Sequence, residues 1–341
     1  MTEFSLSWVR AAGGEVRASV YRALPRSNAR NRRSQHALKT TAAVVVATVV
    51  FGWSGVQTRL MAGVAAAFLM QCVDAGPRRY QQRCMAWSGL AMLAEAFVGP
   101  VLSGYAPVKY GLLVVVAYAV VEVRRRLRNH NGYPLFLFTF FVLTTGLPGG
   151  LGRAWGEMAG VACGLVIALG IYFFVAYRPE MPDAGVKPGA RTGARAAVAA
   201  LLAVAIACLF MLPRAYWAIL TAVVLVAETW RESAKKAFQR VGMTVLGCGI
   251  AFALHFPTAH LPHVTLGLMF LFVYLAVYFR TASYPLMTFF ITLYVAFLFS
   301  VLGEWTPQIL LVRIYETAIG GGTALLAAGL VRGKRSSENE V

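Results

Sequence analysis

The chain has 341 residues, of which 58% are hydrophobic and only 13% are charged. Soluble domains carry about 25% charged residues, so this composition argues against a soluble protein and favours a helical protein that crosses a membrane several times. The net charge of +18 could indicate nucleic-acid binding, but the basic residues lie in turns between apolar runs rather than on one soluble face, so no nucleic-acid partner is expected.

The N-terminal segment 1–37 is polar and rich in arginine, and no apolar core precedes Leu38. It therefore lacks the pattern of a cleavable signal peptide. We expect a basic cytoplasmic leader that is either flexible or forms a short surface helix over residues 4–24.

Apolar runs follow one another along the rest of the chain, and each predicts a membrane-spanning helix. The expected fold class is all-α: a polytopic helical membrane protein of about 12 transmembrane helices. Spans are predicted at 38–53, 57–73, 85–103, 106–122, 134–148, 154–177, 194–212, 215–228, 239–256, 263–279, 284–302 and 310–331. Several are shorter than the ~20 residues usual for a span, so some of these helices could be broken or buried.

The basic residues alternate between the predicted turns. If the N-terminus and every second turn are placed in the cytoplasm, 27 of the 32 Lys and Arg residues lie on that side. The other five occupy the outer turns, at most one in each: Arg59, Lys109, Arg153, Arg214 and Arg313. This positive-inside distribution predicts that both termini are cytoplasmic.

The second half of the chain repeats features of the first half in the same order. Tyr-Pro-Leu, followed closely by Thr-Phe-Phe, begins at Tyr133 and again at Tyr284. An arginine and then a glutamate open both the sixth and the twelfth apolar run. Because each half has an even number of spans, we expect parallel repeats, as in many transporters. The predicted organisation is a leader (1–37), a first six-span repeat (38–177), a cytoplasmic linker (178–195), a second six-span repeat (196–331) and a cytoplasmic tail (332–341).

Motifs for enzyme chemistry are missing from the sequence. We find no Gly-rich phosphate loop, no nucleotide-binding motif, no metal-ligand cluster and no catalytic triad spacing. We therefore expect neither enzymatic activity nor a cofactor or metal. The five cysteines are scattered and lie in or beside apolar runs, which is typical of small packing residues.

Carboxylates at membrane depth are costly, so they are functional candidates. Glu95 lies well inside the third span, while Glu157 and Glu316 open the sixth and twelfth spans. Arg153 stands four residues before Glu157, and Arg313 stands three residues before Glu316, so each pair shares a helix face. Either the pairs lock the bundle, or they form a charged lining in which Glu316, Glu157 or Glu95 takes and releases protons.

Arginines near the outer side are candidates for binding an anion. Arg59 and Arg214 begin corresponding spans of the two halves. They either snorkel to lipid headgroups or present a guanidinium fork to a carboxylate. Tyr216 and Trp217 follow Arg214, and they form either part of an aromatic belt or a stacking surface for an aromatic ligand.

Five motifs in the second half of the chain resemble a known family. They are Arg214-Ala-Tyr216-Trp217-Ala-Ile, Glu228-Thr229-Trp230-Arg231-Glu232, Arg240-Val-Gly242-Met-Thr244 with Gly247, Tyr284-Pro285 with Phe289-Phe290, and Arg313-x-x-Glu316-Thr-x-x-Gly320. Over about residues 195–331 this pattern resembles the fusaric-acid-resistance (FUSC) family, and it is distantly similar to the plant aluminium-activated malate transporters. In the first half, Arg83 lacks the following Gly-Thr, and no Tyr-Trp-Ala motif precedes it.

The resemblance implies a bacterial inner-membrane exporter of aromatic or other organic acids that uses the proton gradient. Small organic anions and the lipid bilayer are then the expected partners, with a homodimer possible. Arg214, Arg240 and Arg313 would attract the anion, with help from Arg59 and Arg153. Two other functions stay open: a passive organic-anion channel, and a membrane assembly or binding subunit that transports nothing.

Overall fold

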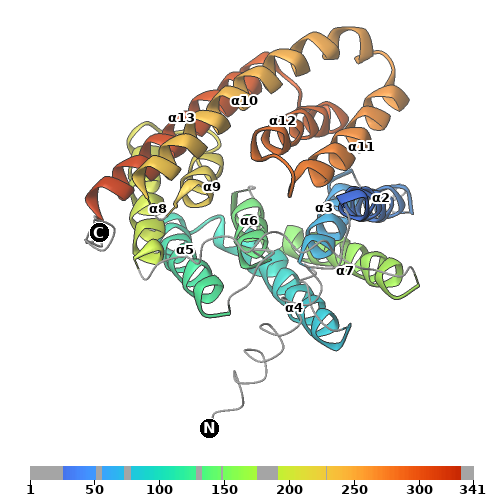
Figure 1. Ribbon diagram of the computed structural model, residues 1–341, viewed down its shortest axis with the longest axis horizontal. Coiled ribbons are helices and arrows are strands. Elements are labelled where there is room, and N and C mark those ends of the chain that lie inside the picture. Colours follow the sequence, from blue (N-terminus) through green and yellow to red (C-terminus); the bar gives the residue numbers. More distant parts are fainter. Residues whose placement is uncertain are drawn as a thin grey trace, which may run out of the picture.

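The computed structural model describes residues 26–50, 56–72, 78–127, 133–146, 149–174, 191–227 and 229–331. Within these ranges the chain forms twelve α-helices and no strand, so the predicted all-α class is confirmed (Figure 1). The predicted surface helix at 4–24, most of the linker and the C-terminal tail lie outside the described residues.

Each half of the chain contributes six of these helices. The first half contains α2 (Arg26–Val50), α3 (Val56–Gln71), α4 (Arg78–Leu102), α5 (Ala106–Leu127), α6 (Tyr133–Gly146) and α7 (Leu151–Phe174). The second half contains α8 (Thr192–Leu209), α9 (Tyr216–Leu225), α10 (Trp230–Thr258), α11 (Pro262–Phe279), α12 (Tyr284–Val301) and α13 (Pro307–Leu330).

Polar caps and prolines set the starts of the later helices. The hydroxyls of Thr229, Ser283 and Thr306 accept hydrogen bonds from backbone N–H groups in the first turns of α10, α12 and α13. Proline stands at the first or second position of α11, α12 and α13, where its missing N–H costs nothing. Local sequence thus accounts for where these helices begin.

Eight helices are long and apolar enough to cross a membrane: α4, α5, α7, α8, α10, α11, α12 and α13. The chain is therefore a multi-pass helical membrane protein. Three of the remaining predicted spans correspond to α3, α6 and α9, whose apolar stretches are shorter. In α9, ten residues rise only about 15 Å, half the thickness of the hydrocarbon layer. Nine of these ten residues are buried, so protein rather than lipid surrounds this helix.

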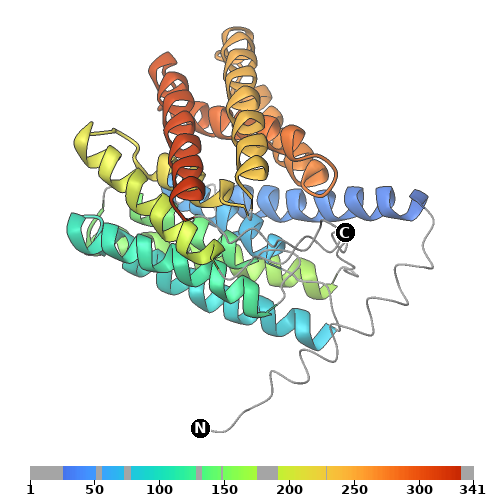
Figure 2. The same ribbon diagram turned by 60° about the vertical axis from the view of Figure 1, so that its left-hand side comes forward.

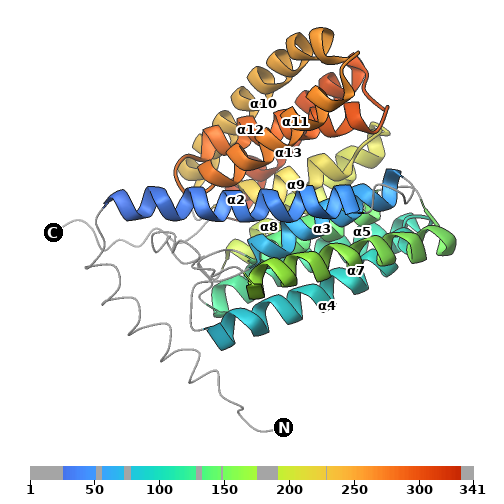
Figure 3. The same cartoon turned by 90° about the vertical axis from the view of Figure 1, so that its right-hand side faces the viewer.

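The same helix pairs pack together in the two halves. The short helix α3 lies against α7 and α2, and the short helix α9 lies against α13 and α8. Likewise α4 packs on α6 and α7, while α10 packs on α12 and α13, and Figure 1 shows α10 and α13 side by side. Between the halves, α5 contacts α8 and α11 contacts α2. Figure 3 shows α2 lying along the boundary between α7 and the later helices.

Glycines permit the closest contact in each half. A side-chain carbon at Gly164 of α7 would overlap the carbonyl oxygen of Ala62 in α3. A side-chain carbon at Gly320 of α13 would lie 2.5 Å from the carbonyl oxygen of Ala218 in α9. Only glycine lets the backbones approach so closely, as at small-residue contacts between membrane helices generally.

One apolar core joins the two halves. Phe138 and Phe141 of α6 pack in the same buried cluster as Trp217 and Leu220 of α9 and Phe299 of α12. Because this cluster contains residues of α6 and of α9, the start of α9 lies where the two halves meet. In Figure 2 the helices of the first half run across the view, while α10 and α13 rise from them steeply.

Candidate functional site

The start of α9 carries three of the predicted site residues into the interior. Arg214 lies in the turn that connects α8 to α9, and Tyr216 and Trp217 are the first two residues of α9. In the same connection Met211 has a positive φ of 47°, which helps the chain reverse direction within a few residues. Because α9 is surrounded by protein, its Tyr-Trp pair is buried rather than placed in a lipid-facing aromatic belt.

Two further predicted residues lie one turn apart near the start of α13. Arg313 is only 6% exposed and Glu316 is fully buried. Both sides of this turn are apolar or small, and Gly320, one turn further on, holds α13 against α9. The glycine contact therefore brings the charged turn of α13 close to Arg214 and Trp217.

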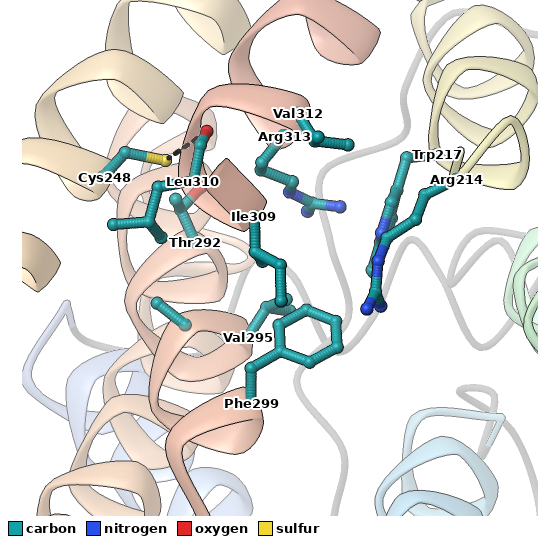
Figure 4. A pocket seen from close by; sticks show the side chains of 11 residues that line it. Arg214, Trp217, Cys248, Thr292, Val295, Phe299, Ile309, Leu310, Val312 and Arg313 are labelled. Carbon is teal, nitrogen blue, oxygen red and sulfur yellow. Dashed lines mark hydrogen bonds between the residues drawn. The ribbon is translucent and has the colours of Figure 1, made fainter. Parts of the chain in front are cut away.

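Aromatic rings face both guanidinium groups. The Arg313 guanidinium carbon lies 3.6 Å from the centre of the Trp217 ring, and the Arg214 guanidinium carbon lies 4.5 Å from the centre of the Phe299 ring. Figure 4 shows the side chains of Arg214 and Arg313 reaching into the space between α12, α13 and the start of α9. Such cation–π contacts stabilise each arginine without neutralising its charge.

Glu316 does not form the ion pair that its spacing from Arg313 allows. Its Oε1 atom instead accepts a hydrogen bond of 2.9 Å from the backbone N–H of Arg214. Within the described part of the chain, Glu316 Oε2 has no hydrogen-bond partner, and neither do Nε and Nη1 of Arg313. Of the two alternatives for this pair, the structure therefore does not contain a locking ion pair between Arg313 and Glu316, because α9 holds each group in a different contact.

A small pocket opens between these groups. Its free volume is about 10 Å³, enough for roughly one water molecule. Most of its lining is apolar, with two guanidinium groups as its charged members. The lining residues are Arg214, Trp217, Cys248, Thr292, Val295, Ala296, Phe299, Ile309, Leu310, Val312 and Arg313.

Several lining residues were not predicted from the sequence. Phe299 stands in an aromatic-rich run of α12 that offers many equivalent rings. Cys248 and Thr292 have no distinctive spacing; the Cys248 thiol donates to the Leu310 carbonyl over 3.7 Å. Their helical spacing, which places them on the faces of α10 and α12 that pack against α13, is the one signal in the sequence that could have indicated these residues.

Arg240 lies on α10, next to the pocket rather than in its lining. Its side chain is buried, at 7% exposure, and it is close enough to Arg313 for the two positive charges to interact. Three of the arginines predicted to attract an anion, Arg214, Arg240 and Arg313, thus gather in one region of the second half.

The predicted residues of the first half do not line this pocket. In α7, Arg153 Nε donates to Glu157 Oε1 over 2.6 Å, and Glu157 is buried. Glu95 lies in α4, half-buried, with its Oε2 atom lacking a hydrogen-bond partner among the described residues. Arg59 belongs to α3, but its side chain lies outside the described part of the structure.

Across the described ranges, no three His, Cys, Asp or Glu residues gather closely enough to hold a metal ion.

Comparison with known proteins supports the likeness carried by the second-half motifs. Residues 201–327 match the family model described as fusaric acid resistance protein-like. An uncharacterized protein of Haemophilus influenzae (strain ATCC 51907 / DSM 11121 / KW20 / Rd) is 32% identical over 139 residues, which cover 40% of this chain and 19% of that protein. The match thus spans about a fifth of the length of this relative. No solved structure matches the chain.

The matched segment contains α9 to α12 entirely, together with half of α8 and most of α13. All residues that line the pocket lie within the matched segment, and so do Arg240 and Glu316. Residues 201–327 of this multi-pass membrane protein therefore match the fusaric acid resistance protein-like family.

Proposed function

We propose that the chain is a secondary transporter that exports organic, preferentially aromatic, carboxylate anions across the bacterial inner membrane, coupled to protons. The observation that carries this proposal is the state of Arg313. Its guanidinium is buried, lines the pocket, lacks an ion pair among the described residues and leaves two nitrogen atoms without hydrogen-bond partners. A buried cation without a counter-ion is costly, and an anionic ligand would supply one.

Aromatic rings beside the cations favour an aromatic acid. Trp217 and Phe299 line the pocket, and each already stacks on a guanidinium group. A planar ring with a carboxylate could stack on these rings while its carboxylate meets the planar fork of Arg313. Arg240 would add to the positive potential that attracts the anion into the site.

Glu316 is the best candidate for coupling to protons. It is fully buried, and only one of its oxygens has a hydrogen-bond partner among the described residues. A carboxyl group beside the anion site that gains a proton in one state and loses it in another would link the two movements. Arg153 neutralises the charge of Glu157 in an ion pair, so we give that pair a structural role.

The size of the pocket indicates a closed state. Free space for about one water molecule does not admit an organic acid, so the helices around it would have to move apart. The recurring helix pairs support two parallel six-helix repeats whose relative motion could open the site. With both termini in the cytoplasm, Arg214 and the start of α13 would lie toward the outer side.

Transport by purified protein in proteoliposomes tests this function. Aromatic and aliphatic carboxylates would be supplied with and without an imposed pH gradient, and protein-free vesicles would measure leakage of the neutral acids. We expect accumulation against the concentration gradient that depends on the protein and on the pH gradient. Downhill flux alone would indicate a channel, and flux equal to that of protein-free vesicles would favour an assembly or binding subunit.

Arg313→Ala and Arg231→Ala form a matched pair for the same assay. Arg231 is an exposed arginine at the start of α10 and is not part of the pocket lining. Loss of flux in the first variant with normal flux in the second would support the proposed anion site.

A further inference from the structure

The turn between α12 and α13 carries an acidic residue to the mouth of the pocket. Gly303 adopts a positive φ of 72°, and its N–H donates to the Ser300 carbonyl over 3.1 Å. The next N–H, that of Glu304, donates to the Phe299 carbonyl over 3.0 Å. The turn therefore folds back onto the end of α12 and places Glu304 beside Phe299.

Glu304 forms an ion pair with Arg214, one of the two arginines that line the pocket. Its Oε2 atom lies 3.3 Å from Nη2 of Arg214, whose Nη1 donates to the Tyr216 hydroxyl over 3.3 Å. The Arg214 side chain is 23% exposed, whereas that of Glu304 is 49% exposed. Moving the Glu304 carboxylate into water therefore breaks one half-exposed ion pair, at a modest cost, while Arg214 stays with Phe299 and Tyr216.

The two cations of the pocket thus differ in what a ligand would find. Arg313 has no carboxylate against it among the described residues, but Arg214 has Glu304. A ligand with one carboxylate can pair with Arg313 and leave Glu304 in place. A ligand with two carboxylates must either displace Glu304 from Arg214 or hold its second charge close to that of Glu304, and both cost free energy.

We propose that Glu304 is a specificity-determining residue that biases the site toward monocarboxylates and against dicarboxylates. This inference rests on the proposed function, since it concerns ligands of the same pocket. Glu304 acts as an internal carboxylate that competes for Arg214, and its unit charge sets the number of negative charges that the pocket accepts.

Calorimetric binding to the purified full-length protein tests the inference. Benzoate and phthalate share an aromatic ring and differ by one carboxylate, and both are compared at a pH where they are fully ionised. Wild type is expected to bind benzoate more tightly. In Glu304→Gln the ratio of the phthalate Kd to the benzoate Kd is expected to fall by roughly three- to tenfold, the range set by a half-exposed charge near a protein surface.

Two control variants separate this effect from general changes in charge or shape. Glu232→Gln removes the same charge from another exposed ion pair, with Lys236 on α10, and should leave the ratio unchanged. Glu304→Asp keeps the charge and should stay closer to wild type than Glu304→Gln does. Glu304→Ala provides the same comparison if the glutamine variant does not fold.

The outcomes distinguish the inference from the proposed function. If wild type binds and transports no carboxylate, the proposed function fails and the role of Glu304 fails with it. If wild type binds benzoate but removal of the Glu304 charge leaves the ratio unchanged, only the role of Glu304 is overturned. A ratio that falls equally in Glu232→Gln would also overturn it, because the effect would then belong to net charge.

Discussion

Two helices that begin with an arginine and then a glutamate, α7 in the first half and α13 in the second, use these charges differently. In α7, Arg153 and Glu157 stand four residues apart and form an ion pair at 2.6 Å. In α13, Arg313 and Glu316 stand three residues apart, yet Arg313 stacks on Trp217 while Glu316 accepts from the backbone of Arg214. The arginine and the glutamate therefore form an ion pair with each other in the first half, whereas in the second half each contacts α9 instead.

The short helices explain the difference. The start of α9 offers a tryptophan ring and a backbone N–H to α13, and the glycine contact between Gly320 and Ala218 sets their approach. In α7, Trp155 instead packs on Phe97 of α4, with the ring centres 5.2 Å apart. In this chain the arginine and the glutamate are kept apart only where a neighbouring helix supplies competing partners.

Replacing the two arginines by alanine should give the largest contrast. Arg313→Ala removes the proposed anion contact, so kcat/KM for an aromatic acid should fall by about a hundredfold or more while the protein still folds. Arg153→Ala leaves the buried Glu157 without its ion pair, so it should cost about 3 kcal/mol of stability while the protein that folds keeps most of its flux.

Thermal unfolding in detergent and flux in proteoliposomes measure the two effects side by side. The comparison of the two helices would be wrong if Arg153→Ala abolished flux in folded protein. It would be equally wrong if Arg313→Ala unfolded the protein without any separate loss of transport.

Substitution of the close-contact glycines, Gly164 in α7 and Gly320 in α13, should destabilise the protein to a similar extent. The difference between α7 and α13 would then concern only their charged residues. Gly320→Ala and Gly164→Ala each add a carbon that overlaps a carbonyl oxygen of the facing short helix, so each should cost about 1–3 kcal/mol. Gly322 and Gly170 meet no other atoms within 4 Å of an added carbon and serve as matched controls on the same helices. Equal melting temperatures for Gly320→Ala and Gly322→Ala would contradict the close packing of α9 on α13.

The sequence was sufficient to predict most of the longer helices. The predicted spans 239–256 and 310–331 fall on α10 (Trp230–Thr258) and α13 (Pro307–Leu330), because apolar runs and polar caps are local signals. The number of true spans stays a prediction, since α3, α6 and α9 are too short to be assigned by length and α2 (Arg26–Val50) is not among the eight candidates. Their burial depends on neighbours that are distant in sequence.

Part of the pocket lining was predictable from the sequence, but its contacts were not. Costly charges and aromatic residues indicated Arg214, Trp217, Arg313 and Glu316. Spacing on α13 allowed an ion pair between Arg313 and Glu316 as one of two alternatives, and the sequence of the helix alone does not show which partners compete for them. The partners that α9 supplies lie about a hundred residues earlier in the chain, so only the tertiary structure reveals them.

Glu316→Gln sharpens the contrast between the two buried glutamates. The glutamine can still accept from the Arg214 N–H but cannot exchange a proton, so downhill flux should stay within about threefold of wild type while accumulation driven by the pH gradient is lost. Glu157→Gln in α7 is the control and should keep gradient-driven accumulation. Gradient-driven transport by folded Glu316→Gln protein would exclude Glu316 from coupling.

Trp217→Leu should have the smallest effect, and it tests why the ligand should be aromatic. Leucine keeps an apolar wall but removes the ring that stacks on Arg313, so the preference for benzoate over cyclohexanecarboxylate should fall by about three- to tenfold. Trp155→Leu removes a ring near the start of α7, which lies outside the pocket lining, and should leave that preference unchanged. The ratio of the two KM values measures the effect directly. If both variants lowered it equally, selection for aromatic acids would arise before the ligand reaches Arg313, and the difference between α7 and α13 would concern charge alone.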